Sequence, residues 1–162
     1  MKILGIDPGI ARCGWGVVDV NKSKLTVIKY GCIETSSEIE IPQRLTLVYK
    51  EVQKIIKTYS PDEFAIEELF FNTNAKTAFV VGQARGVILL SAAQNNIPIS
   101  IYTPLQIKMA LTGYGRAEKN QIGHMVKTLL TLKEIPKPDD TTDALAVAMA
   151  HAFSNKYNKS IK

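Results

Sequence analysis

Hydrophobic and polar residues alternate in three short runs near the start of the chain, which is the period of β-strands. The runs cover Lys2–Asp7, Gly14–Val20 and Leu25–Glu34. Because only short segments connect them, we expect the three strands to pair as an antiparallel meander.

The hydrophobic pattern changes to the period of a helix in residues 41–59. Pro42 suits the first turn of this helix, and its apolar face is formed by Leu45, Val48, Val52, Ile55 and Ile56. The rest of the pattern predicts, in order, a strand at 63–67, a helix at 75–94, a strand at 98–102 and helices at 104–111, 118–131 and 139–154.

This order of elements predicts an α/β fold with a mixed five-stranded sheet and helices on both faces. With 162 residues, 46% of them hydrophobic, we expect a single domain over residues 1–155 and a basic, flexible tail at 156–162. Gln83 and Arg85 interrupt the most apolar long stretch, so we expect no membrane span. Two distant cysteines make no disulfide framework, which favours a cytoplasmic protein.

Positive charge is concentrated in the second part of the chain. Residues 1–100 contain 11 Lys and Arg against 10 Asp and Glu, whereas residues 101–162 contain 9 against 5. A basic half indicates a polyanionic partner such as DNA. A solvated helix face with a lysine-rich end would give the same asymmetry, so charge alone leaves both interpretations open.

The first strand ends on a carboxylate, in the segment ILGIDPG. Asp7, Pro8 and Gly9 make a good turn, in which the aspartate accepts a backbone hydrogen bond. Asp7 would also lie at the carboxyl end of a central strand, where open α/β sheets bind their ligands. The segment by itself permits both interpretations.

Further acidic residues end the fourth strand and begin the last helix. Glu67 and Glu68 end FAIEE, while Asp139, Asp140 and Asp143 open DDTTDALAVAMAH. Capping explains one of the first two aspartates but explains Asp143 poorly, because the helix that follows is apolar on nearly all sides. Clustered carboxylates suit hard cations, and two Mg²⁺ ions about 3.5–4 Å apart can clamp the reacting oxygens of a phosphodiester.

Several segments together resemble the RuvC family of bacterial Holliday-junction resolvases. They are ILGIDPG, FAIEELF, GQARGV, AEKNQIGHMVKTLL and DDTTDALAVAMAH, in the order and spacing of the family over nearly the whole chain. The resemblance implies a ribonuclease-H-like fold, a homodimer and metal-dependent nicking of four-way DNA junctions in two strands of like polarity. It also implies 5′-phosphate and 3′-hydroxyl ends, a role in homologous recombination and DNA repair, and the RuvA–RuvB branch-migration complex as a partner.

The resemblance also assigns catalytic residues. By position in the motifs it selects Glu67 and Asp140 over their neighbours Glu68 and Asp139. The expected cofactor is Mg²⁺, two ions per active site, with Mn²⁺ as a substitute. The metal-binding and catalytic acids that it implies are Asp7, Glu67, Asp140 and Asp143.

The family pattern implies DNA contacts for three further residues. Lys108 and Lys119 match lysines near the active site, and Phe70 matches an aromatic residue that stacks against an unpaired base. Arg116 lies in the same segment as the lysines without a motif match, and a phosphate contact is our hypothesis for it. The helix at 75–94 matches the family's subunit interface.

Two other classes of protein fit parts of the sequence. ATP-using enzymes of the actin and sugar-kinase type have a similar first hairpin, but they need two such domains and a second glycine-rich phosphate loop. A non-catalytic binder of branched DNA would explain the charge, but not Asp143 in an apolar helix.

Overall fold

The computed structural model describes residues 1–22, 24–68 and 75–160, without the side chains of 75–77 and 155–160. Five strands form one sheet in the order β3-β2-β1-β4-β5. Their bounds are β1 (Lys2–Asp7), β2 (Arg12–Asn21), β3 (Lys24–Glu34), β4 (Glu63–Glu67) and β5 (Ile99–Tyr102). β1, β2 and β3 are antiparallel neighbours, whereas β4 runs parallel to β1 and β5. The predicted mixed five-stranded sheet is confirmed.

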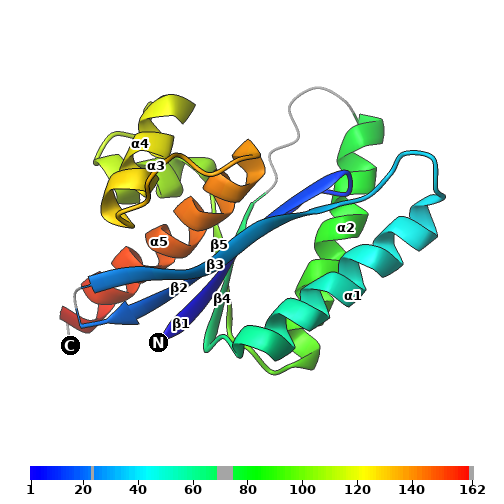
Figure 1. Ribbon diagram of the computed structural model, residues 1–162, viewed down its shortest axis with the longest axis horizontal. Helices are drawn as coiled ribbons and strands as arrows, with labels where there is room; N and C mark the ends of the chain where they lie inside the picture. The colour runs from blue at the N-terminus through cyan, green and yellow to red at the C-terminus, as the bar shows by residue number, and fades with distance from the viewer. Residues whose placement is uncertain (23, 69–74, 161–162) are drawn as a thin grey trace.

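Helices cover both faces of the sheet (Figure 1). Their bounds are α1 (Ile41–Tyr59), α2 (Ala75–Gln94), α3 (Pro104–Thr112), α4 (Lys119–Leu129) and α5 (Asp139–Ser160). α1 and α2 lie on one face, while α5 lies on the other with α3 and α4 packed against it (Figure 1). No helix in the described part of the chain is long and apolar enough to cross a membrane.

Two hydrophobic clusters form the core, one on each face of the sheet. On the α5 face, Leu145, Val147 and Met149 are fully buried against strand residues such as Ile3 and Val18. The second cluster joins α1 and α2 to the opposite sheet face. The apolar helix predicted after Asp143 is thus buried, as we expected.

The predicted end of the last helix is wrong. α5 continues to Ser160 instead of ending at Ser154. Residues 155–160 contain neither Gly nor Pro, so nothing in the sequence interrupts the backbone hydrogen bonds of the helix. Residues 156–160, which we expected in a flexible tail, are therefore helical.

α5 lies directly on β1 and β2 because glycines face it. A Cβ atom added at Gly5 would overlap the backbone of Ala144, and one added at Gly14 would overlap the backbone of Asp140. A Cβ at Gly16 would press on the side chain of Leu145. Glycine inside a strand often marks such a close approach. These three glycines, which we call the glycine seat, fix the height of α5 above the sheet.

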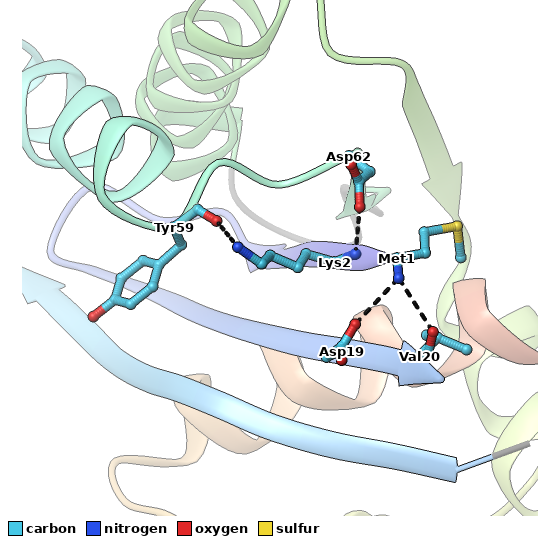
Figure 2. A network of polar contacts seen from close by, with 6 residues as sticks. All are labelled: Met1, Lys2, Asp19, Val20, Tyr59 and Asp62. Carbon is cyan, nitrogen blue, oxygen red and sulfur yellow. Dashed lines mark hydrogen bonds and ion pairs between the residues drawn. The ribbon is translucent and has the colours of Figure 1, made fainter. Parts of the chain in front are cut away.

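The start of β1 is held by polar contacts on both sides (Figure 2). The amino group of Met1 donates to Asp19 Oδ1 at 3.1 Å on β2. On the other side, the Lys2 N–H donates to Asp62 Oδ2 at 2.7 Å, and Lys2 Nζ donates to the carbonyl oxygen of Tyr59 at 3.0 Å. These contacts tie β1 to β2 and to the connection between α1 and β4.

Candidate active site

Asp7 and Glu67 end two neighbouring strands at the same edge of the sheet. Asp7 is the last residue of β1 and pairs with Gly14 of β2. β1 and β4 are parallel and in register up to Ile6 and Ile66, so the next residue on each strand is an acid. Parallel strands bring their carboxyl ends together, which is where ligands bind in sheets of this kind.

α5 brings its first turns to the same edge. The backbone of Asp140 rests on Gly14, whose Cα partner in the ladder is Asp7. Asp143 lies one turn further along α5 and is half-buried, with 27% of its side chain exposed. Four acids from three separate segments of the chain thus lie at one edge of the sheet, positioned by the strand register and the glycine seat.

The electrostatics of Asp7 show how near these acids are. The pKa of Asp7 is raised to about 8, chiefly because the carboxyl group is buried and then by the charges of Glu67, Asp143 and Asp140, in that order. Lys119 acts in the opposite direction. Burial without a partner disfavours the charged form, and like charges add to that effect.

The pKa values of Glu67 and Asp143 are also raised. Burial, followed by the charge of Asp143, raises the pKa of Glu67 to about 7, although Lys119 and Lys108 oppose this. The pKa of Asp143 is also raised, mainly by burial, against the hydrogen bond and charge of Lys119. Perturbed carboxyl groups of this kind mark candidate functional sites.

A cavity of about 230 Å³ adjoins the acids. Its lining includes the acids Glu67 and Asp143 as well as Lys108 of α3 and Lys119 of α4. Two capping boxes place the lysines: Thr103 with Gln106 begins α3, and Glu118 with Gln121 begins α4. Lys119 Nζ donates to Asp143 Oδ2 at 3.0 Å and lies 3.4 Å from Asp139 Oδ2.

Asp139 and Glu68, the neighbouring acids that the family motifs did not select, are more exposed than the acids of the site. The side chain of Asp139 is 71% exposed, and its charge is not among those acting on Asp7. Glu68 is exposed, and its backbone N–H donates to the carbonyl oxygen of Tyr102.

Arg116 is exposed in the connection between α3 and α4 and does not line the cavity. Phe70 lies outside the described residues.

The turn after Asp7 is held by residues that our sequence analysis did not identify. Thr35 Oγ1 donates to the carbonyl oxygen of Ile10 at 2.6 Å, and the Thr35 N–H donates to that of Ala11 at 3.1 Å. Arg44 Nε donates to Thr35 Oγ1 at 2.8 Å from α1, where Arg44 is buried. The only sequence signal was an arginine beside the apolar face of an amphipathic helix.

Divalent metal ions fit the donor chemistry of the acids, since all the side-chain donors are carboxylate oxygens. Across residues 1–22, 24–68 and 75–160, however, no three Asp, Glu, His or Cys side chains are grouped so that they could hold an ion as they stand. The acids are close enough to raise one another's pKa but are not drawn together. Asp143 is at the same time paired with Lys119 Nζ at 3.0 Å.

The sheet order, with helices on both faces, is that of a ribonuclease-H-like fold. The model of the family "Crossover junction endodeoxyribonuclease RuvC" matches residues 3–151. The crossover junction endodeoxyribonuclease RuvC of Alkaliphilus oremlandii is 54% identical over 162 residues, covering 100% of this chain and 99% of the relative.

The chain is also similar to solved structures of RuvC. Thermus thermophilus RuvC has a TM-score of 0.91 at 35% identity, covering 98% of this chain and 97% of that one. The T. thermophilus RuvC in complex with Holliday junction substrate has a TM-score of 0.89 at 34% identity, covering 97% and 96%. The chain belongs to the RuvC family of crossover junction endodeoxyribonucleases and is therefore an enzyme that hydrolyses phosphodiester bonds in DNA.

Proposed function

We propose that this enzyme resolves four-way DNA junctions by nicking two strands of like polarity, each nick leaving a 5′-phosphate and a 3′-hydroxyl. The observation that carries the proposal is the position of four acids at one edge of the sheet, where Asp7 and Glu67 end neighbouring parallel strands beside the first turns of α5. Homologous recombination and DNA repair supply such junctions, and their delivery by the RuvA–RuvB complex is part of the same proposal.

Asp7, Glu67, Asp140 and Asp143 would hold two Mg²⁺ ions, or Mn²⁺ in their place. Bound there, such ions supply a water of lowered pKa and stabilise the charge on the attacking and leaving oxygens. The protein's part is to hold the carboxylates in place, and the positive charge of the ions would favour their ionised form. The strand register fixes Asp7 and Glu67, and the glycine seat fixes Asp140 and Asp143.

Lys108 and Lys119 would bind the phosphates of the strand to be cut. Both line the cavity beside Glu67 and Asp143, so a phosphate held by either lysine lies next to the acids. Contact with the phosphate group orients the strand and stabilises charge that builds up on it. We also propose Arg116 and Phe70 as DNA contacts, Arg116 on the strength of its exposure in the same segment.

A homodimer would provide the two nicks. α2 carries a stripe at helical spacing, formed by the exposed Phe79, Gly86 and Leu90 and the half-buried Gly82. Phe79 is 69% exposed and Leu90 51%, and nothing lies within 4 Å of a Cβ added at either glycine. An apolar stripe with room for a close helix suits contact with a second copy, and a two-fold dimer matches two symmetric cuts.

The test is a nicking assay on a synthetic four-way junction in Mg²⁺. We expect wild type to make paired nicks. Glu67→Gln should reduce the nicking rate about 100-fold or more, because one of the proposed metal ligands is removed and charge in the transition state is less well stabilised. Glu68→Gln, the adjacent exposed acid, is the matched control and should keep most of the activity. Equal activity of the two variants, or full cutting by Asp7→Asn, would contradict the proposal.

A further inference from the structure

The contact between Lys119 and Asp143 places an ammonium group where a metal ligand is needed. Lys119 Nζ lies 3.0 Å from Asp143 Oδ2 and 3.4 Å from Asp139 Oδ2. We propose that Lys119 competes with the metal ion for Asp143 and turns to the DNA phosphates once a cation has taken the carboxylate. This inference rests on the proposed metal-dependent function of the same site.

The position of Lys119 suits such an exchange. Lys119 is the first residue of α4, and the Glu118 N–H donates to Gln121 Oε1 at 2.8 Å, so the backbone at this point is capped. The side chain is 61% exposed and can rotate without disturbing the core. Asp143 is the less exposed partner at 27%, so the lysine is the group that moves.

The competition is direct because both cations need the same oxygen. A hard divalent cation binds carboxylate oxygens, and Asp143 Oδ2 already accepts a hydrogen bond from Lys119. A bound ion would also repel the ammonium group, which then faces the cavity that it shares with Lys108. A DNA phosphate in that cavity offers the displaced lysine a new partner.

The exchange links metal binding to DNA binding. A cation that releases Lys119 adds one phosphate contact, so it should raise the affinity for DNA. By thermodynamic reciprocity, DNA that engages Lys119 should raise the affinity for the cation by the same factor. The enzyme would thus bind the metal ion more weakly without DNA than with it.

Lys108 provides a matched control. It lines the same cavity, and its charge acts on Glu67, as does that of Lys119. Among the ion pairs between described residues, those of the site involve Lys119 and not Lys108. Lys108→Met therefore removes one positive charge from the cavity without releasing Asp143.

The experiment is a calorimetric titration of the full chain with Mn²⁺ in the absence of DNA. We expect Lys119→Met to bind Mn²⁺ about three- to tenfold more tightly than Lys108→Met, the range set by a partly exposed ion pair. Asp143→Asn should lower Mn²⁺ affinity in both backgrounds. Equal Mn²⁺ affinities of Lys119→Met and Lys108→Met would overturn the competition. In that case the proposed metal site would still stand, provided that Asp143→Asn weakens Mn²⁺ binding.

A wild-type protein that binds no Mn²⁺, or binds it equally well after Asp143→Asn, would instead overturn the proposed metal site and the competition with it. The release of Lys119 to DNA is tested by junction binding with and without Ca²⁺, a hard cation for the same oxygens. We expect Ca²⁺ to raise junction affinity about threefold less in Lys119→Met than in wild type or Lys108→Met. The same gain in all three proteins would overturn the release.

Discussion

Asp7 is both partly buried and surrounded by other acids, which makes its ionisation costly for the folded protein. A carboxyl group whose pKa is higher in the folded than in the unfolded state binds more protons when folded. The ordinary pKa of Asp7 is 3.8 and its folded value is about 8; for Glu67 the values are 4.5 and about 7. Folding stability should therefore fall as the pH rises from about 4 to about 8, when no divalent ion is present.

Replacing Asp7 with Asn should relieve this cost. In EDTA at pH 8, we expect Asp7→Asn to be more stable than wild type by about 1–3 kcal/mol, since each pKa unit corresponds to about 1.4 kcal/mol and relaxation absorbs part of the shift. The difference should shrink toward pH 5. Urea unfolding followed by circular dichroism at both pH values measures it, and a variant less stable than wild type at pH 8 would contradict the explanation.

Asp139 and Asp140 are adjacent in sequence and should differ in activity. The charge of Asp140 acts on Asp7, whereas Asp139 is 71% exposed and is held by Lys119. We expect Asp140→Asn to reduce junction nicking about 100-fold or more and Asp139→Asn to retain most of it. Single-turnover nicking in Mg²⁺ compares the two, and the reverse order would assign the site to Asp139.

At the scale of elements, the contact of α5 with the glycine seat determines where Asp140 and Asp143 lie. Gly14→Ala places a methyl group against the backbone of Asp140, so the helix start must shift. We expect a loss of about 1–3 kcal/mol in unfolding free energy, as for other overpacked contacts, together with reduced nicking.

Gly86→Ala is the control for this change at concentrations where the protein is monomeric, because nothing in its own chain lies within 4 Å of the added Cβ. In a helix this substitution should raise stability by about 0.5–1 kcal/mol. Urea unfolding of both variants provides the comparison. A Gly14→Ala protein as stable as wild type would show that α5 has room above the sheet.

Much of this architecture could be predicted from the sequence, because the pattern of each strand and helix is local. The three-strand meander, the amphipathic α1 and the buried α5 follow from periodicity alone, and the family motifs pointed to Asp7 and Glu67. The ion pair between Lys119 and Asp143 could not be predicted, since it joins two helices through side-chain rotamers. Gly5, Gly14 and Gly16 offered a signal, glycine inside strands, that indicates a close approach but not the partner.

At the scale of the whole molecule, the stripe on α2 should determine whether the protein is a monomer or a dimer. Phe79→Glu places a charge within the proposed apolar contact, so we expect the variant to be monomeric by light scattering at concentrations where wild type is dimeric. Leu105→Glu is the control, because Leu105 is 60% exposed on α3, away from the stripe. A monomeric Leu105→Glu protein beside a dimeric Phe79→Glu protein would move the interface to α3.

The glycine seat has a consequence for protein engineering and for exchange of segments between homologues. At Gly5 and Gly14 the first two strands meet the backbone of the last helix without a strand side chain between them. A chimaera that takes α5 from one relative and β1–β2 from another should work only when glycines are kept at positions 5 and 14. The beginning and the end of the gene are in this sense a single module, although more than a hundred codons separate them.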